Sequence, residues 1–148
     1  MKIVVLVGLP GSGKSTWLER IGAKGLSSDA IRLWLADDEN DQTIHDRVFQ
    51  TLRYLLRQRL TIGRPATYID ATNLTPQERA PYVGIGKAFG CRMEAVYFDI
   101  PLEVCRQRNA SRSRVVPDDV MRALAAKLVP PSADEGFARI TVISEPRP

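Results

Sequence analysis

The stretch Gly8-Leu9-Pro10-Gly11-Ser12-Gly13-Lys14-Ser15-Thr16 decides the fold of this chain. It is a complete G-x-x-x-x-G-K-[ST] pattern, in which glycines let backbone N–H groups converge on a β-phosphate and the lysine adds positive charge. The apolar run 3–7 before it predicts a buried strand, and residues 16–21 after it predict a helix whose N-terminal dipole faces the anion. An ordinary glycine-rich turn is the alternative, but this strand and helix context favours nucleotide binding.

The loop supplies most of the predicted nucleotide site. The residues expected to hold the nucleotide are Gly11, Ser12, Gly13, Lys14, Ser15 and Thr16. ATP or another NTP is the expected phosphate donor. The Ser15 hydroxyl is a predicted ligand of Mg²⁺, or of Mn²⁺ in its place.

Composition indicates one globular domain over residues 1–148, with 44% hydrophobic and 26% charged residues. No apolar run approaches the roughly 18 residues that a membrane span needs, so no membrane partner is expected. Met1 and Lys2 lead directly into the first strand, which leaves no room for a signal peptide. Cys91 and Cys105 are interpreted as buried small hydrophobic residues in a reduced cytosol, and a cytoplasmic location is expected.

Strands and helices alternate along the chain. Strands are predicted at 3–7, 66–70, 93–98 and 139–143, with helices between them. Residues 25–28 are expected to form a short second strand or an extended turn. A T-x-x-E capping box at Thr75, followed by Pro76, predicts a helix to about Phe89. The expected fold is therefore α/β, a P-loop NTPase with a five-stranded parallel sheet covered by helices on both faces. Its active site is expected at the carboxyl edge of the strands.

A long helix is predicted to run to about Thr61, capped by Asn40 or Asp41. Apolar residues follow the spacing of a buried face: Ile44, Val48, Leu52, Leu55 and Leu56. The other side carries Arg47, Arg53, Arg57 and Arg59, a pattern more typical of a solvated face than of a binding surface. The net charge is +4 and arginine predominates among the 21 basic residues, which points mildly towards phosphorylated or nucleic-acid partners.

Asp29 follows the second strand, and Arg32 lies on the same helical face. A carboxylate beside a γ-phosphate can accept the proton of an attacking hydroxyl, and an arginine one turn away can hold a phosphate of the acceptor. Asp29 is equally well suited to cap the following helix. Both roles stay open at this point.

Asp70 ends the third strand in the Walker-B position, where a carboxylate can hold Mg²⁺ directly or through water. The alternative is a turn formed by Asp70, Thr72 and Asn73. Because of where the strand should end, a metal or active-site role is favoured.

The run 106–114 contains four arginines and no acid. Placed between two helices over the carboxyl edge, such a run could neutralise charge on the transferring phosphoryl group. A lid over about residues 106–117 is therefore predicted, in preference to a solvated basic surface.

Together these motifs resemble the 5′-OH polynucleotide kinase group of P-loop phosphotransferases. The resemblance rests on residues 8–17, Ser28-Asp29-Ala30-Ile31-Arg32, Asp70-Ala71-Thr72-Asn73-Leu74, Arg108-Asn109-Ala110-Ser111-Arg112 and Val116-Pro117-Asp118-Asp119-Val120. It implies that Lys14 and Ser15 bind phosphates and Mg²⁺, that Asp29 activates the 5′-hydroxyl, and that Arg32 contacts an acceptor phosphate. It also implies that Arg108 and Arg112 engage the donor phosphates, whereas Arg106 and Arg114 match less well.

The resulting hypothesis is a kinase that transfers the γ-phosphate of an NTP to a DNA or RNA 5′-OH by in-line displacement. In nucleic-acid repair, a separate phosphatase or ligase would then supply the other end-healing steps. One alternative is a related kinase of a small alcohol such as a nucleoside, sugar or antibiotic. The other is a nucleotide-dependent switch without group transfer.

Overall fold

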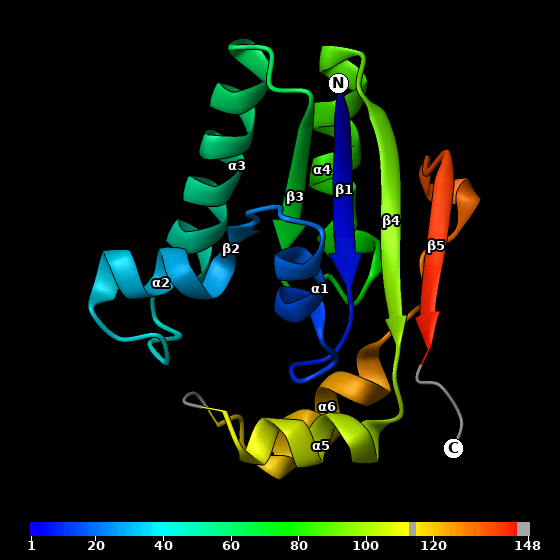
Figure 1. Ribbon diagram of the computed structural model, residues 1–148. Helices are drawn as coiled ribbons and strands as arrows, with labels where there is room; N and C mark the ends of the chain where they lie inside the picture. The colour runs from blue at the N-terminus through cyan, green and yellow to red at the C-terminus, as the bar shows by residue number, and fades with distance from the viewer. Residues whose placement is uncertain (113–114, 145–148) are drawn as a thin grey trace.

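The computed structural model describes residues 1–112 and 115–144, and strands alternate with helices along it (Figure 1). The strands are β1 (Lys2–Val7), β2 (Leu26–Ser27), β3 (Ala66–Asp70), β4 (Arg92–Asp99) and β5 (Arg139–Ser144). The helices are α1 (Lys14–Arg20), α2 (Ser28–Ala36), α3 (His45–Thr61), α4 (Pro76–Phe89), α5 (Leu102–Ala110) and α6 (Asp118–Lys127), with a 3₁₀ helix, η1, at Ala133–Glu135. The strands expected from the sequence are confirmed.

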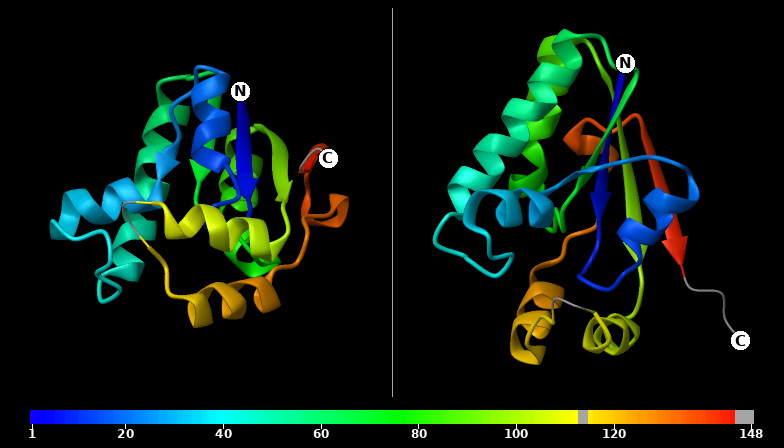
Figure 2. Two further views of the ribbon diagram at one scale, coloured as in Figure 1. Left: turned by 60° about the horizontal axis from the view of Figure 1, so that its bottom comes forward. Right: turned by 60° about the vertical axis from the view of Figure 1, so that its left-hand side comes forward.

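The five strands form one parallel sheet in the order β2-β3-β1-β4-β5. The chain leaves β1 towards β2 and β3 on one side and later adds β4 on the other, so the strand order reverses at β1. In open α/β sheets, ligands bind beyond the carboxyl ends of the strands at such a reversal. The loop that follows β1 lies at this position, and α5 and α6 lie beyond the same edge (Figures 1 and 2).

Strand β1 is buried on both faces. Ile3, Val5 and Val7 belong to a core cluster with residues of α3 and α4, whereas Val4 and Leu6 pack in a second cluster with residues of α1, α5 and α6. Alternation along a strand directs successive side chains to opposite faces, so a continuous apolar run indicates helices on both sides. The predicted three-layer α/β arrangement is thus confirmed.

Helix α3 buries the face that its apolar spacing predicts. Val48, Leu52 and Leu56 are each 0% exposed, and Leu60 continues the row one turn further along. These side chains pack with Ile3 and the other odd residues of β1. The helix therefore attaches the α2–α3 segment firmly to the sheet.

The predicted cap of this helix is wrong. α3 begins at His45, several residues after Asn40 and Asp41, and its N-terminus has no side-chain cap. Asp41 Oδ1 instead accepts hydrogen bonds from the backbone N–H and the hydroxyl of Thr43, and Asp38 Oδ1 accepts from Asn40 N. Asp and Asn side chains often close tight turns in this way, so here they shape the loop before the helix.

The capping box of α4 is confirmed. Thr75 Oγ1 accepts from Glu78 N, and Glu78 Oε2 accepts from the backbone N–H groups of Leu74 and Thr75. The helix ends at Phe89, as predicted, and is followed by Gly90, whose φ of 69° is left-handed.

Cys91 and Cys105 are both free thiols, and Cys105 is buried. Of the helices in residues 1–112 and 115–144, none combines the length and apolar character that a membrane-spanning helix requires.

Candidate active site

The loop between β1 and α1 is shaped by glycines in left-handed conformations. Gly11 has a φ of 82° and Gly13 a φ of 97°. A Cβ on Gly11 would lie 2.5 Å from the carbonyl oxygen of Cys105, so a larger residue would collide with the backbone of α5 as well as adopt a strained φ. The glycine therefore lets α5 lie directly against the loop.

Lys14 lies inside this loop. Its Nζ donates to the carbonyl oxygens of Gly8 and Leu9, each at 2.9 Å. Burial lowers the pKa of Lys14 to about 8, although the Asp70 carboxylate acts in the opposite direction. The ammonium is thus placed where the motif predicts, and its positive charge is stabilised further by any anion that the loop binds.

Ser15 and Asp70 form a pair suited to a divalent cation. Ser15 Oγ donates to Asp70 Oδ2 across 3.3 Å. Burial raises the pKa of Asp70, against the opposing effects of Lys14 and Ser15, so an adjacent cation would stabilise its charged form. Among the described residues no group of three or more His, Cys, Asp or Glu could hold a metal. Mg²⁺ typically takes one or two protein oxygens plus substrate phosphates, and this pair fits that pattern.

Two roles were open for the segment at the end of β3, a metal or active-site role and a turn, and different residues fill them. Asp70 faces the phosphate-binding loop, as the hydrogen bond from Ser15 shows. Asn73, by contrast, is buried with a φ of 49°, and its Nδ2 donates to the carbonyl oxygen of Leu6 across 2.7 Å. Asn73 therefore joins the end of β3 to the end of β1, while Asp70 remains available to the site.

The cap of α2 is Ser27 and not Asp29. Ser27 Oγ accepts from Ala30 N across 3.1 Å, which satisfies the first turn of the helix. Asp29 lies in that turn with Oδ1 3.9 Å from Arg32 Nη1 and Oδ2 4.0 Å from Arg112 Nη2. Because the capping role is filled by another residue, the geometry favours the functional interpretation of Asp29.

Arg32 is only 4% exposed, although it lines a cavity that also contains Lys14 and Ser15 of the phosphate-binding loop. Its Nε donates to the carbonyl oxygen of Asp41 across 3.0 Å, and its Nη2 lies 3.4 Å from His45 Nδ1. The pairing of Arg32 with Asp29 on one helical face is confirmed by the 3.9 Å contact. Its contacts with the α2–α3 loop and with α3 were not foreseen from the sequence.

Two arginines of the predicted lid face the phosphate-binding loop. Arg108 is on α5, and its Nη1 lies 3.6 Å from the point where a side chain at Gly13 would place its Cβ. Arg112 follows α5 and lies beside Asp29. Both residues line the same cavity as Lys14, as expected for side chains that contact donor phosphates.

Arg106 has a different role. Its guanidinium donates to Glu103 within α5 and, across 2.7 Å, to Asp118 at the start of α6. It therefore links the two helices that bound the predicted lid. Arg114, together with Ser113, lies outside the described residues.

One cavity of about 1140 Å³ joins these groups. The loop, Asp70 and the two arginines of the α5 region form one end, which we name the donor end after its predicted role. The other end, named the acceptor end in the same way, is formed by α2, by Gln42 of the α2–α3 loop and by the first turns of α3, where His45 and Phe49 line the wall. The His45 and Phe49 rings lie 4.8 Å apart. Sequence reasoning missed these three residues because no contiguous motif marks them, although His45 is the single histidine of the chain.

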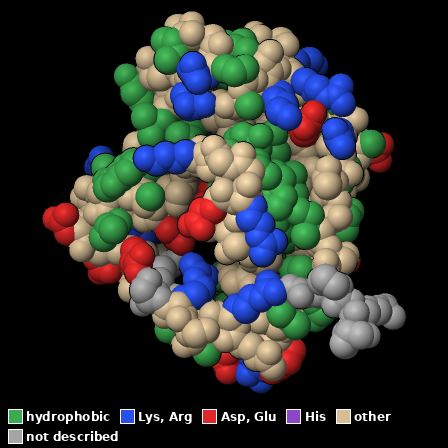
Figure 3. Space-filling model, in the orientation of Figure 1, with side chains coloured by type: hydrophobic (Ala, Val, Ile, Leu, Met, Phe, Trp, Pro, Cys, Tyr) green, Lys and Arg blue, Asp and Glu red, His purple; other side chains and the backbone are tan. Residues whose placement is uncertain are grey.

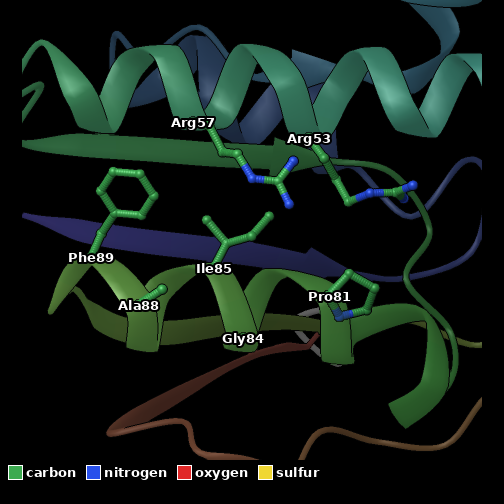
Figure 4. Close-up of a pocket in the computed structure, with 7 residues that line it drawn as sticks. All are labelled: Arg53, Arg57, Pro81, Gly84, Ile85, Ala88 and Phe89. Atoms are coloured by element: carbon green, nitrogen blue, oxygen red, sulfur yellow. The ribbon is translucent and has the colours of Figure 1, made fainter.

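The basic face of α3 does not reach this cavity. Figure 4 shows Arg53 and Arg57 directed over a separate groove between α3 and α4, floored by Ile85 and flanked by Phe89. Arg59 donates to the carbonyl oxygen of Ala66 and to the Thr67 hydroxyl, and so fixes α3 to β3. The predicted solvated face is confirmed for Arg47 and Arg57, which are exposed, but not for Arg59, which is half-buried and bonded to β3.

A phosphate-binding loop at the central strand of a parallel sheet, with carboxylates and arginines facing it across one cavity, is the arrangement of a P-loop NTPase. The chain belongs to the family described as AAA domain (AAA_33), whose model matches residues 3–131.

Several known proteins with similar sequences or structures are named as kinases. An L-seryl-tRNA(Sec) kinase from Methanococcus maripaludis is 23% identical over 136 residues, which are 87% of this chain and 53% of the relative. The chain thus spans about half the length of that curated relative. A sugar kinase from Janibacter sp. HTCC2649 superposes with a TM-score of 0.69 at 20% identity, over 97% of this chain and 85% of that one. The APS kinase of Mycobacterium tuberculosis gives 0.60 at 19% identity, over 99% and 90%. These two structural likenesses establish the fold.

Proposed function

We propose that the chain transfers the γ-phosphate of ATP to a hydroxyl group of a small alcohol. The observation that carries this proposal is the single cavity in which Lys14 and Ser15 at one end face Asp29 and the α2–α3 wall at the other. A kinase needs both a donor and an acceptor within one enclosed space, because transfer requires the attacking oxygen in line with the leaving oxygen.

In the proposed reaction, the acceptor oxygen forms a bond to the γ-phosphorus as the bond from that phosphorus to the bridging β–γ oxygen breaks. Asp29 accepts the hydroxyl proton and ADP leaves. Lys14, Arg108 and Arg112 supply positive charge to the phosphoryl oxygens. Ser15 and Asp70 would hold Mg²⁺, which would neutralise negative charge on the donor phosphates.

The distribution of arginines favours a small acceptor over a polynucleotide. Backbone phosphates beyond a reacting 5′-hydroxyl need a run of cationic side chains that leads away from the site. Arg53 and Arg57 lie over the α3–α4 groove instead, and Arg59 is bonded to β3. Two of the similar structures support this choice by their names, a sugar kinase and an APS kinase, whereas the sequence relative is named as a kinase of L-seryl-tRNA.

Acidic residues near the acceptor end favour the same choice. Asp37 and Asp38 are exposed after α2, and the adjacent Glu39 lines the cavity. On the face shown in Figure 3, acidic side chains gather over α2 and the segment that follows it, on the left. Like charges beside the acceptor entrance would repel a phosphate backbone.

Transfer of label from [γ-³²P]ATP to a set of acceptors tests the proposal. The set contains D-gluconate, D-glucose, adenosine, adenosine 5′-phosphosulfate, kanamycin, L-seryl-tRNA and a 5′-OH oligonucleotide. We expect kcat/KM to be highest for one of the small alcohols. Preferential labelling of the oligonucleotide would restore the polynucleotide hypothesis, and tight ATP binding without labelling of any acceptor would favour a nucleotide switch.

A further inference from the structure

Arg32 is enclosed at the acceptor end of the cavity, and its nitrogens are directed at three separate segments. Nη1 faces the Asp29 carboxylate in the first turn of α2, Nε bonds to Asp41 in the α2–α3 loop, and Nη2 faces His45 at the start of α3. With 4% exposure, most of this side chain is surrounded by protein. The guanidinium therefore fixes the relative positions of Asp29 and His45.

The contact with Arg32 favours one tautomer of His45. A guanidinium has only donors, so a hydrogen bond from Nη2 to the Nδ1 atom 3.4 Å away requires Nδ1 to accept. The proton of that tautomer is on Nε2. The His45 ring also packs against Phe49 at 4.8 Å, which restricts its rotation.

His45 itself remains accessible. It is exposed and lines the cavity beside Gln42 and Phe49. Since Nδ1 is engaged by Arg32, Nε2 is the ring nitrogen that remains to bind a ligand. A neutral Nε2–H in this position donates a hydrogen bond, and a suitable partner is an oxygen atom of the acceptor.

We propose that Arg32 is a positioning residue that fixes His45 as an Nε2–H donor, and that His45 selects acceptors carrying a second oxygen beyond the reacting hydroxyl. The substrate class is then a polyol, sugar or hydroxy acid and not a simple monoalcohol. This inference rests on the proposed function for the placement of the acceptor, but the contact between Arg32 and His45 does not.

The single histidine allows a direct spectroscopic test. In protein labelled with ¹⁵N-histidine, long-range ¹H–¹⁵N spectra at about pH 7.5, where a free imidazole is largely neutral, distinguish the two tautomers. We expect one Nε2–H species in the wild type and a tautomer mixture in Arg32→Lys, because lysine lacks the planar fork. Arg47→Lys, an exposed change on the same turn of α3, is the matched control and should keep the wild-type spectrum. A mixed, protonated or Nδ1–H ring in the wild type would overturn the proposal.

Kinetics then test the selection of the acceptor. Asn at position 45 retains an oxygen near the Nδ1 position, whereas Gln reaches the Nε2 position with an amide donor. With the acceptor of highest kcat/KM in the set above, we expect His45→Asn to raise its KM about tenfold, the effect of one lost hydrogen bond, and to leave the KM for ATP unchanged. His45→Gln should restore most of the acceptor affinity.

The outcomes separate the two proposals. An unchanged acceptor KM in both His45 variants would overturn the selective role of His45 while leaving the kinase function intact. Glycerol and ethanol serve as probes with and without a second oxygen. Equal kcat/KM for the two would also overturn the selective role of His45 while leaving the kinase function intact. If no acceptor is labelled, the proposed function fails, and with it the selective role of His45. The histidine spectra then decide only whether Arg32 positions the ring.

Discussion

The two ends of the cavity are built in different ways. The donor end comes from one contiguous stretch, in which glycine conformations and backbone groups set the shape and Lys14 bonds to carbonyls of its own loop. The acceptor end comes from side chains on α2, the α2–α3 loop and α3, brought together by Arg32. A site formed by the backbone of one contiguous stretch tolerates few substitutions, and its motif can be recognised in the sequence. A site formed by side chains from several segments can acquire a different substrate specificity by substitution while the fold stays the same.

The largest expected effect falls on the donor end. Lys14→Ala removes the ammonium that every phosphate donor requires, so transfer to every acceptor should fall by at least about 10³-fold. Steady-state assays with [γ-³²P]ATP measure this loss. Lys87→Ala, an exposed change on α4, is the control and should leave transfer unaltered. Substantial activity in Lys14→Ala with any acceptor would place the donor elsewhere.

Asp29 lies where the two ends meet, and Asp29→Asn should lower kcat by about 10²–10⁴-fold. The KM for ATP should change little, because the donor contacts remain. Thermal stability should also be retained, since Ser27 and not Asp29 caps α2. Asp46→Asn, in the exposed first turn of α3, is the matched control. Normal turnover in Asp29→Asn would remove this residue from the mechanism.

The buried Arg79 and its partner Glu135 lie outside the lining of the cavity, so breaking this pair should affect stability more than chemistry. Arg79 is 0% exposed, bonds to the carbonyl oxygens of Asn73 and Val129, and pairs with Glu135 at 2.7 Å. Glu135→Ala leaves the buried guanidinium without its carboxylate partner and should destabilise the fold by about 3–5 kcal/mol. Urea unfolding measures the effect. A change below about 1 kcal/mol, the range of an exposed pair, would show that the pair behaves as a surface salt bridge.

The same pair predicts a dependence of stability on pH. Burial acts to raise the pKa of Glu135, but hydrogen bonds from Arg79 and Ser132 outweigh it and hold the pKa below its ordinary value. A carboxyl with a depressed folded pKa contributes stability above its unfolded pKa and loses it as pH falls through the folded value. The difference in unfolding free energy between wild type and Glu135→Gln should therefore shrink below about pH 4.5, the ordinary value for this group. A constant difference down to acid pH would contradict the assignment.

The smallest expected effect concerns the arginines of the α3–α4 groove. Because Arg53 and Arg57 line a separate groove, the double change to Ala should leave kcat and both KM values within about twofold of wild type, the effect of remote surface sites. A sharper test compares how the KM for the 5′-OH oligonucleotide depends on salt in the wild type and in the double variant. A marked rise between roughly 50 and 200 mM salt that disappears in the double variant would assign these arginines to a polynucleotide.

The sequence predicts the donor end because its information is local. Residues 8–16 specify backbone geometry, strand periodicity locates Asp70 at the carboxyl edge, and the capping box defines the start of α4. The cap of α3 could not be predicted in the same way, because Asp41 had two local uses and the turn with Thr43 prevailed. His45 and the buried Arg79 depend on contacts between distant segments, for which composition and spacing carry no signal.

The central claim is that one cavity passes a phosphoryl group from ATP to a small alcohol. The most direct measurement compares [γ-³²P]ATP with [α-³²P]ATP in the presence of the acceptor set, and identifies the labelled product by mass spectrometry. The account predicts that only the γ-label moves, that one ADP forms per phosphorylated acceptor, and that a small polyol, sugar or hydroxy acid is labelled faster than the oligonucleotide. ADP formation without a phosphorylated product, or labelling of the oligonucleotide alone, would contradict it.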